Sequence, residues 1–156
     1  MFGLDLHPAL VHFPIALGVI GAVMEVIYFV LRPKGVKWFG PVLLTLALAG
    51  SGAAYFSGQS VKDKALDQGA PHELVEKHET TCVWALGALG LAALLSWAVR
   101  PTGRGVWLSS LIALAAAGLT LYTAYLGAEL VYRHGAGRVK AVVHPVKPPP
   151  RKGAKR

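Results

Sequence analysis

The segment ALVHFPIALGVIGAVMEVIYFVL, residues 9–31, is apolar over almost its whole length. It exceeds the roughly 20 residues that a helix needs to cross the hydrocarbon core of a bilayer. Three more apolar stretches follow, at residues 36–58, 80–99 and 106–132. The sequence therefore predicts an all-α integral membrane protein, an up-and-down bundle of four transmembrane helices.

The composition agrees with this class of protein. Hydrophobic residues make up 54% of the chain and charged residues 15%, and the mean hydropathy is +0.48. These values lie far from those of soluble domains. Once the spans are removed, the 156 residues leave no room for a separate soluble domain. We expect one transmembrane domain at residues 1–134, followed by a tail at residues 135–156.

Short breaks separate the spans in pairs. Residues 32–35 divide the first span from the second, and residues 100–104 divide the third from the fourth, and both breaks contain Arg, Pro and Gly. Such breaks are typical of tight turns, so we expect two hairpins on one side of the membrane. The longer polar stretch at residues 59–79 then lies on the opposite side, together with both termini.

Four of the six histidines fall at span ends that this topology brings to one face. His7 and His12 belong to the start of the first span. His78 precedes the third span, and His134 follows the fourth. A single histidine at a membrane boundary is commonplace, but four from three helices indicate a haem or metal site.

The first and third helices of such a bundle are diagonal neighbours, so His12 and His78 are the first choice of axial ligands for a haem iron. His7 and His134 are the second choice. They would bind a propionate, ligate a second haem, or complete a nonhaem zinc, copper or iron site with Glu73, Glu76 or Glu79. Cys82 is the only cysteine and no CxxCH motif occurs, so a haem b would be held noncovalently.

Glu25 interrupts the first span, where an ionised carboxylate is costly unless it is paired. About 20 Å of helix separates it from His12, so the two residues do not share a site. We expect Glu25 to pair with a neighbouring helix or with a hairpin arginine. A proton path or a quinone contact at that face is the alternative.

Charge gives conflicting indications of the orientation. Both hairpins carry basic residues and no acid, which places them in the cytoplasm by the positive-inside rule. The chain from Arg133 onward has eight basic residues and no acid, which argues the opposite. The first hairpin usually dominates, so we expect the histidine face and both termini on the extracytoplasmic side of the membrane.

The tail combines proline with clustered base, so we expect it to be disordered. Anionic lipid headgroups or an acidic protein surface are its expected partners. No nucleic-acid partner is expected, because the rest of the chain offers no recognition surface for one.

Two motifs carry a resemblance to a known family. HPALVHFPI at residues 7–15 and VYRHG at residues 131–135 resemble the HPxxVHFPI and VYxHG signatures of a small bacterial membrane family, the domain of unknown function 2231. The resemblance extends over nearly the whole chain up to Gly137. It implies a four-helix fold in the inner membrane of a bacterium. It also implies a link with respiratory electron transfer, because some members are joined to redox domains, and the four histidines are the matching positions.

These observations favour a small b-type cytochrome-like subunit rather than an independent enzyme. It would pass electrons between quinol or a membrane enzyme and a redox partner protein. The alternative is a noncatalytic membrane anchor or assembly subunit of a larger complex, with or without zinc or copper bound by the histidines. Membrane lipid is a partner in either case.

Overall fold

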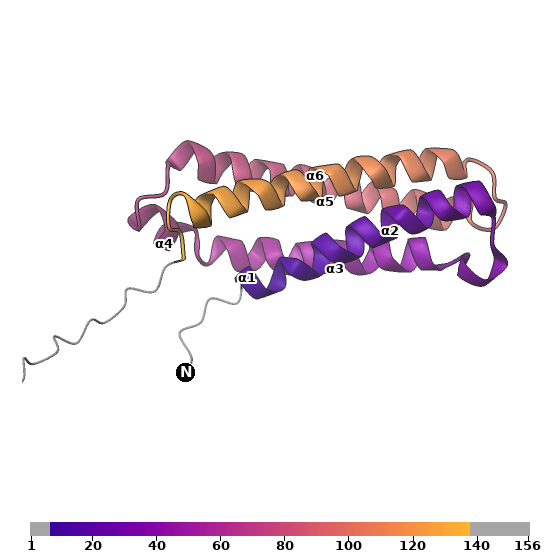
Figure 1. Ribbon diagram of the computed structural model, residues 1–156, viewed down its shortest axis with the longest axis horizontal. Coiled ribbons are helices and arrows are strands. Elements are labelled where there is room, and N and C mark those ends of the chain that lie inside the picture. The colour runs from indigo at the N-terminus through magenta and orange to yellow at the C-terminus, as the bar shows by residue number, and fades with distance from the viewer. Residues whose placement is uncertain (1–6, 138–156) are drawn as a thin grey trace, which may run out of the picture.

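The computed structural model describes residues 7–137, and these form a long bundle of helices (Figure 1). Four helical stretches are long and apolar enough to cross a membrane, and they span His7–Leu31, Lys34–Gln59, His72–Val99 and Val106–Tyr132. The predicted all-α, four-span fold is confirmed. The predicted basic tail lies almost entirely outside the described residues.

The elements are named in chain order. They are α1 (His7–Leu10), α2 (His12–Leu31), the 3-10 turn η1 (Lys34–Val36), α3 (Phe39–Gln59), α4 (Lys62–Asp67), α5 (His72–Val99) and α6 (Val106–Tyr132). The two tight connections, α2 to α3 and α5 to α6, lie at one end of the bundle, and α1 and α4 lie at the other (Figure 1). We call these the hairpin end and the histidine end.

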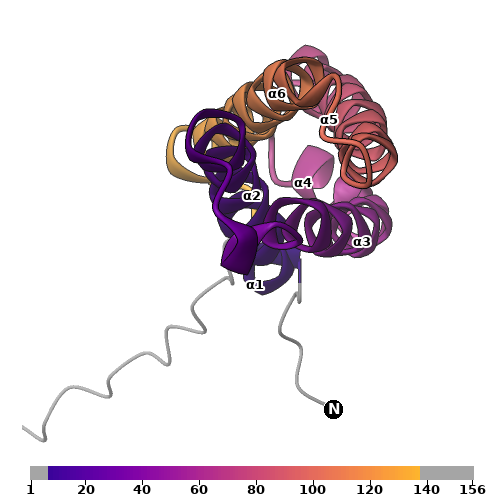
Figure 2. The same cartoon turned by 90° about the vertical axis from the view of Figure 1, so that its right-hand side faces the viewer.

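The four long helices follow one another around a ring in the order α2, α3, α5, α6 (Figure 2). The pairs in extensive contact are α2 with α3, α3 with α5, α5 with α6, and α6 with α2. Therefore α2 lies diagonally across from α5. The expectation that the first and third spans are diagonal neighbours is confirmed.

Small side chains pack in the middle of the bundle. Its buried apolar core consists mainly of alanines from all four long helices: Ala22, Leu44, Ala47, Leu89, Ala92, Ala93, Ala113, Ala116 and Ala117. Alanine at the contact positions lets helix backbones approach closely, which is how helices associate in lipid. Large apolar side chains such as Phe13, Trp84 and Leu94 point outward, where a bilayer would cover them.

The polar stretch between the second and third spans is more helical than the sequence suggested. It contains α4, and α5 begins at His72, eight residues before the expected span start at residue 80. Pro71 is extended immediately before the helix, and Glu73 in the first turn interacts favourably with the helix dipole. As a result, His78 lies more than one turn inside a helix rather than at a loop end.

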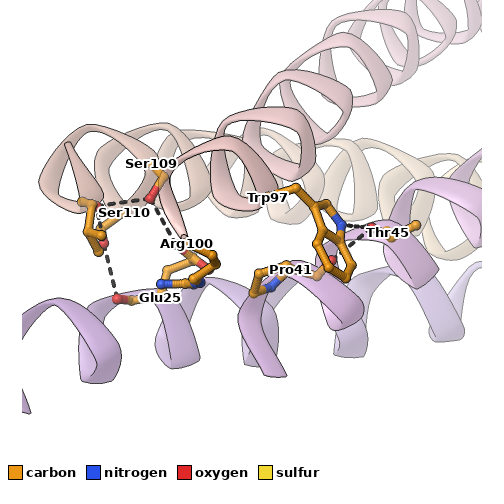
Figure 3. A network of polar contacts seen from close by, with 8 residues as sticks. Glu25, Pro41, Thr45, Trp97, Arg100, Ser109 and Ser110 are labelled. Carbon is orange, nitrogen blue, oxygen red and sulfur yellow. Dashed lines mark hydrogen bonds and ion pairs between the residues drawn. The ribbon is translucent and has the colours of Figure 1, made fainter. Parts of the chain in front are cut away.

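A buried ion pair holds the hairpin end together. Glu25 of α2 and Arg100 after α5 are paired and fully buried, and the Arg100 guanidinium lies 4.1 Å from the ring centroid of Tyr28. Ser109 Oγ donates to Glu25 Oε2 at 2.9 Å, and Ser110 Oγ donates to the Glu25 carbonyl at 3.1 Å (Figure 3). The expected pairing of Glu25 with a hairpin arginine is confirmed.

Gly40, in the first turn of α3, makes room for this pair. A Cβ atom at this position would collide with Glu25 Oε1 and lie 3.0 Å from Arg100 Nη2. The carboxylate and guanidinium therefore lie directly against the α3 backbone. The ion pair thus joins the α2–α3 hairpin to the α5–α6 hairpin.

Candidate functional site

Two of the predicted histidines, His7 and His78, line the same two cavities at the histidine end. The larger cavity has a volume of about 390 Å³ and the smaller about 140 Å³. The larger volume falls within the range of sites for small molecules and cofactors. His7 begins α1 and His78 belongs to α5, so the two imidazoles come from diagonally opposed spans.

His7 is fixed by the backbone of α3. Its Nδ1 lies 3.0 Å from the Ala54 carbonyl oxygen and 3.0 Å from Ser57 Oγ. The Ser57 hydroxyl donates to the same Ala54 carbonyl at 2.8 Å. Because a carbonyl oxygen only accepts, His7 Nδ1 carries the proton, which leaves the lone pair of the neutral imidazole on Nε2.

His78 is fixed in the same way by the backbone of α6. Its Nδ1 donates to the Thr123 carbonyl oxygen at 3.1 Å, so its lone pair is also on Nε2. Cys82, one turn further along α5, places its Sγ atom 3.7 Å from this Nε2. Histidines that bind metals usually donate their other ring nitrogen to a carbonyl or carboxylate in this manner.

Each imidazole also lies against a glycine of the neighbouring helix. A Cβ atom at Gly58 would lie 3.1 Å from Cε1 of His7, and one at Gly127 would lie 3.1 Å from Cε1 of His78. In both cases the glycine follows the accepting carbonyl by four residues, from Ala54 to Gly58 and from Thr123 to Gly127. The two histidines therefore occupy equivalent settings in the two halves of the bundle.

The other two predicted histidines are placed differently. His12 is exposed, and its Nδ1 donates to the Pro8 carbonyl at 2.7 Å within its own segment. It lines the larger cavity only. His134 follows α6, is half-buried, and lines neither cavity. The first-choice pair, His12 and His78, thus shares the larger cavity with His7, whereas His7 and His78 are the predicted histidines that line both cavities.

Polar side chains gather at one end of the smaller cavity. Lys62 of α4 forms an ion pair with Glu79 of α5, and Gln59 Nε2 donates to Glu79 Oε1 at 2.7 Å. The hydrogen bond with Glu79 raises the pKa of Lys62, so its ammonium stays charged at neutral and alkaline pH. The chain therefore presents an apolar cavity with a charged end.

The donor set limits which inorganic site these residues can form. Residues 7–137 include no group of three or more His, Cys, Asp or Glu side chains that could hold a metal ion by themselves. Two imidazoles whose lone pairs are on Nε2 are a donor set that would suit a haem iron, although the Nε2 of His78 contacts Cys82 Sγ in the present arrangement. The side chains present thus fit a haem better than a bare zinc or copper ion.

Several lining residues were not predicted from the sequence. Gly50, Ala54 and Gly58 recur at intervals of four residues on α3, a spacing that is typical of helix packing in membranes, and Gly127 lies beside Ala124 and Ala128 of a similar series on α6. Tyr55 and Cys82 line both cavities. The interval of four residues from the accepting carbonyl to the glycine is common to both histidine sites. It can be recognised in the sequence only after the structure has shown which carbonyl each histidine contacts.

Comparison with known proteins supports the family resemblance. The model of the family described as predicted membrane protein DUF2231 matches residues 3–140, which is most of the chain. The chain has no significant match among curated proteins or among solved structures. The match includes the four helices and both histidines that line the cavities, and the chain therefore belongs to the DUF2231 family of predicted membrane proteins.

Proposed function

We propose that this chain is a small b-type cytochrome-like membrane subunit in which His7 and His78 hold the iron of a haem b through their Nε2 atoms. One observation carries the proposal. Both imidazoles line the same cavities, and both have Nδ1 bound to a backbone carbonyl of the next helix, which leaves Nε2 as the ligand atom. His12 becomes a second choice because it is exposed.

The protein's contribution would be to position and tune the iron. The carbonyls of Ala54 and Thr123 fix the ring orientation and increase the basicity of each Nε2. The mainly apolar lining would lower the polarity around the iron, which is a further influence on a reduction potential. A bound haem would supply a one-electron couple.

The proposed electron donor is quinol or a membrane enzyme, and the proposed acceptor is a redox partner protein. The orientation proposed from charge supports an acceptor outside the bacterial inner membrane. Arg32, Lys34, Lys37 and Arg104 lie at the hairpin end with no acidic residue in either hairpin, which favours the cytoplasm for that end.

An absorption spectrum of the purified full-length protein tests the proposal. We expect a Soret band and, after reduction with dithionite, a sharp α-band, with one haem per chain by pyridine haemochrome assay. Colourless protein that also fails to bind added haem would refute the cytochrome hypothesis. That result would leave the noncatalytic anchor or assembly subunit, and metal analysis of the same sample would show whether zinc or copper is bound.

The glycine contacts give a second prediction. Gly127→Ala should improve intrinsic helix propensity yet weaken haem binding by about tenfold, because the His78 ring must shift by a few tenths of an ångström. Haem titration and thermal unfolding in detergent measure the two effects. Gly118→Ala on the same helix is the matched control, since a Cβ there meets nothing within 4 Å. Equal haem affinity in both variants would contradict the proposed position of His78 against Gly127.

A further inference from the structure

The charged side chains that line the two cavities are confined to one place. Among the described residues around both cavities they are Lys62, Lys64 and Glu79, and all three belong to the smaller cavity. The larger cavity has no Asp, Glu, Lys or Arg among residues 7–137 of its lining. A molecule that fills this space meets mainly apolar surface along its body and charged groups at one end only.

That end carries charges of both signs. Among the described residues of its lining, Lys62 and Lys64 come from α4 and Glu79 from α5, and Lys62 is paired with Glu79. The acids of α4, Asp63 and Asp67, are exposed and belong to neither lining. Lys62 of the short helix is partly buried and lines the cavity, whereas the two carboxylates of that helix do not line it.

Glu79 shows what kind of group this end accepts. Its carboxylate receives the Lys62 ammonium on one oxygen and the Gln59 amide on the other. Lys62 and Glu79 are about 30% and 27% exposed, so their contact is partly shielded from water. A ligand carboxylate that reaches this end would find the same two donors, and hydrogen bonds of this charge-assisted kind are the stronger ones in proteins.

We propose that Lys62 binds a carboxylate of an amphipathic ligand whose apolar body occupies the cavities lined by His7 and His78. This inference rests on the proposed function, and it identifies the carboxylates as haem propionates. Lys62 then exchanges Glu79 for the ligand carboxylate or shares its protons between the two.

The test compares haem b with its dimethyl ester, in which both carboxylates are neutral. Full-length protein free of bound haem is titrated in detergent with each ligand, and the Soret band reports binding. We expect the wild-type chain to bind haem b at least about tenfold more tightly than the ester. Lys62→Met should remove this preference, whereas Lys62→Arg should retain it.

Two further variants sharpen the comparison. Lys77→Met is the matched control, because Lys77 lies at the same end of the bundle but lines neither cavity. It should keep the wild-type preference. Glu79→Gln removes the carboxylate that competes for Lys62, so it should increase the preference for haem b over the ester. Helical circular dichroism of each variant verifies that the bundle is intact.

The outcomes separate the two proposals. Equal binding of haem b and ester by the wild-type chain, or an unchanged preference in Lys62→Met, would overturn the role of Lys62. The cytochrome proposal would survive that result, because both ligands would still give a Soret band that depends on His78. If neither ligand gave such a band, the proposed function would fail and the propionate site with it.

Discussion

Replacement of His78 by alanine is expected to weaken haem binding by at least about a hundredfold, since removal of a ligand should cost no less than the loss of its outer-shell partner. His7→Ala should have a similar effect, because the two imidazoles are held by equivalent carbonyl and glycine contacts. The measurement is a haem titration of detergent-purified variants, with the pyridine haemochrome assay reporting bound haem.

The controls for this prediction are the other two predicted histidines. His12→Ala and His134→Ala should keep the haem content of the wild-type chain, because the first residue is exposed and the second lines neither cavity. Free imidazole should restore a six-coordinate spectrum to His78→Ala, since the truncated side chain leaves space for it. A His12 variant that loses haem while His7→Ala retains it would reverse the assignment.

The choice between His7 and His12 illustrates what the sequence can and cannot predict. The sequence correctly places both at the start of the first span. A helix turns about 100° per residue, so side chains five residues apart point about 140° away from each other. In one continuous helix, therefore, only one of the two side chains can face the bundle axis. Which one does so depends on the packing of the α1 segment against α3, and a single sequence does not contain that information.

The hydrogen-bond partners of His7 and His78 cannot be predicted from the sequence for a related reason. Their hydrogen-bond acceptors are backbone carbonyls, which every residue possesses, so nothing in the side chains of Ala54 or Thr123 marks them. The early start of α5 was missed because hydropathy locates the apolar part of a helix and not its polar extension. The four spans and their diagonal order, in contrast, follow from hydropathy and short connections alone.

Glu25 was correctly expected to be paired, because an isolated carboxylate in a membrane helix is too costly. Helix geometry also favours one of the hairpin arginines as its partner. Arg32 lies seven residues along the same helix, about 10 Å away in rise, so Arg100 of the other hairpin is better placed. In the structure, Arg32 donates instead to the Gly103 carbonyl at 3.0 Å and forms a second, exposed link between the hairpins.

Breaking the Glu25–Arg100 pair from one side is expected to destabilise the fold by about 3–5 kcal/mol, because it leaves an uncompensated charge in the bundle interior. Both side chains are fully buried. Glu25→Met and Arg100→Met are the two single variants, and methionine suits the space because it is unbranched and flexible. Sodium dodecyl sulfate titration of the detergent-purified protein, followed by circular dichroism, gives the free energies of unfolding.

The double variant should be far more stable than the sum of the two single effects predicts, and it should lie close to the wild-type chain. The pair is costly to desolvate, and Arg100 Nε and Nη1 have no hydrogen-bond partner among the described residues, so the ion pair recovers only part of that cost. Arg104→Met, at an exposed position of the same hairpin, should change stability by less than about 0.5 kcal/mol. Additive losses in the double variant would show that the two charges contribute separately, and the ion pair would then not be what joins the two hairpins.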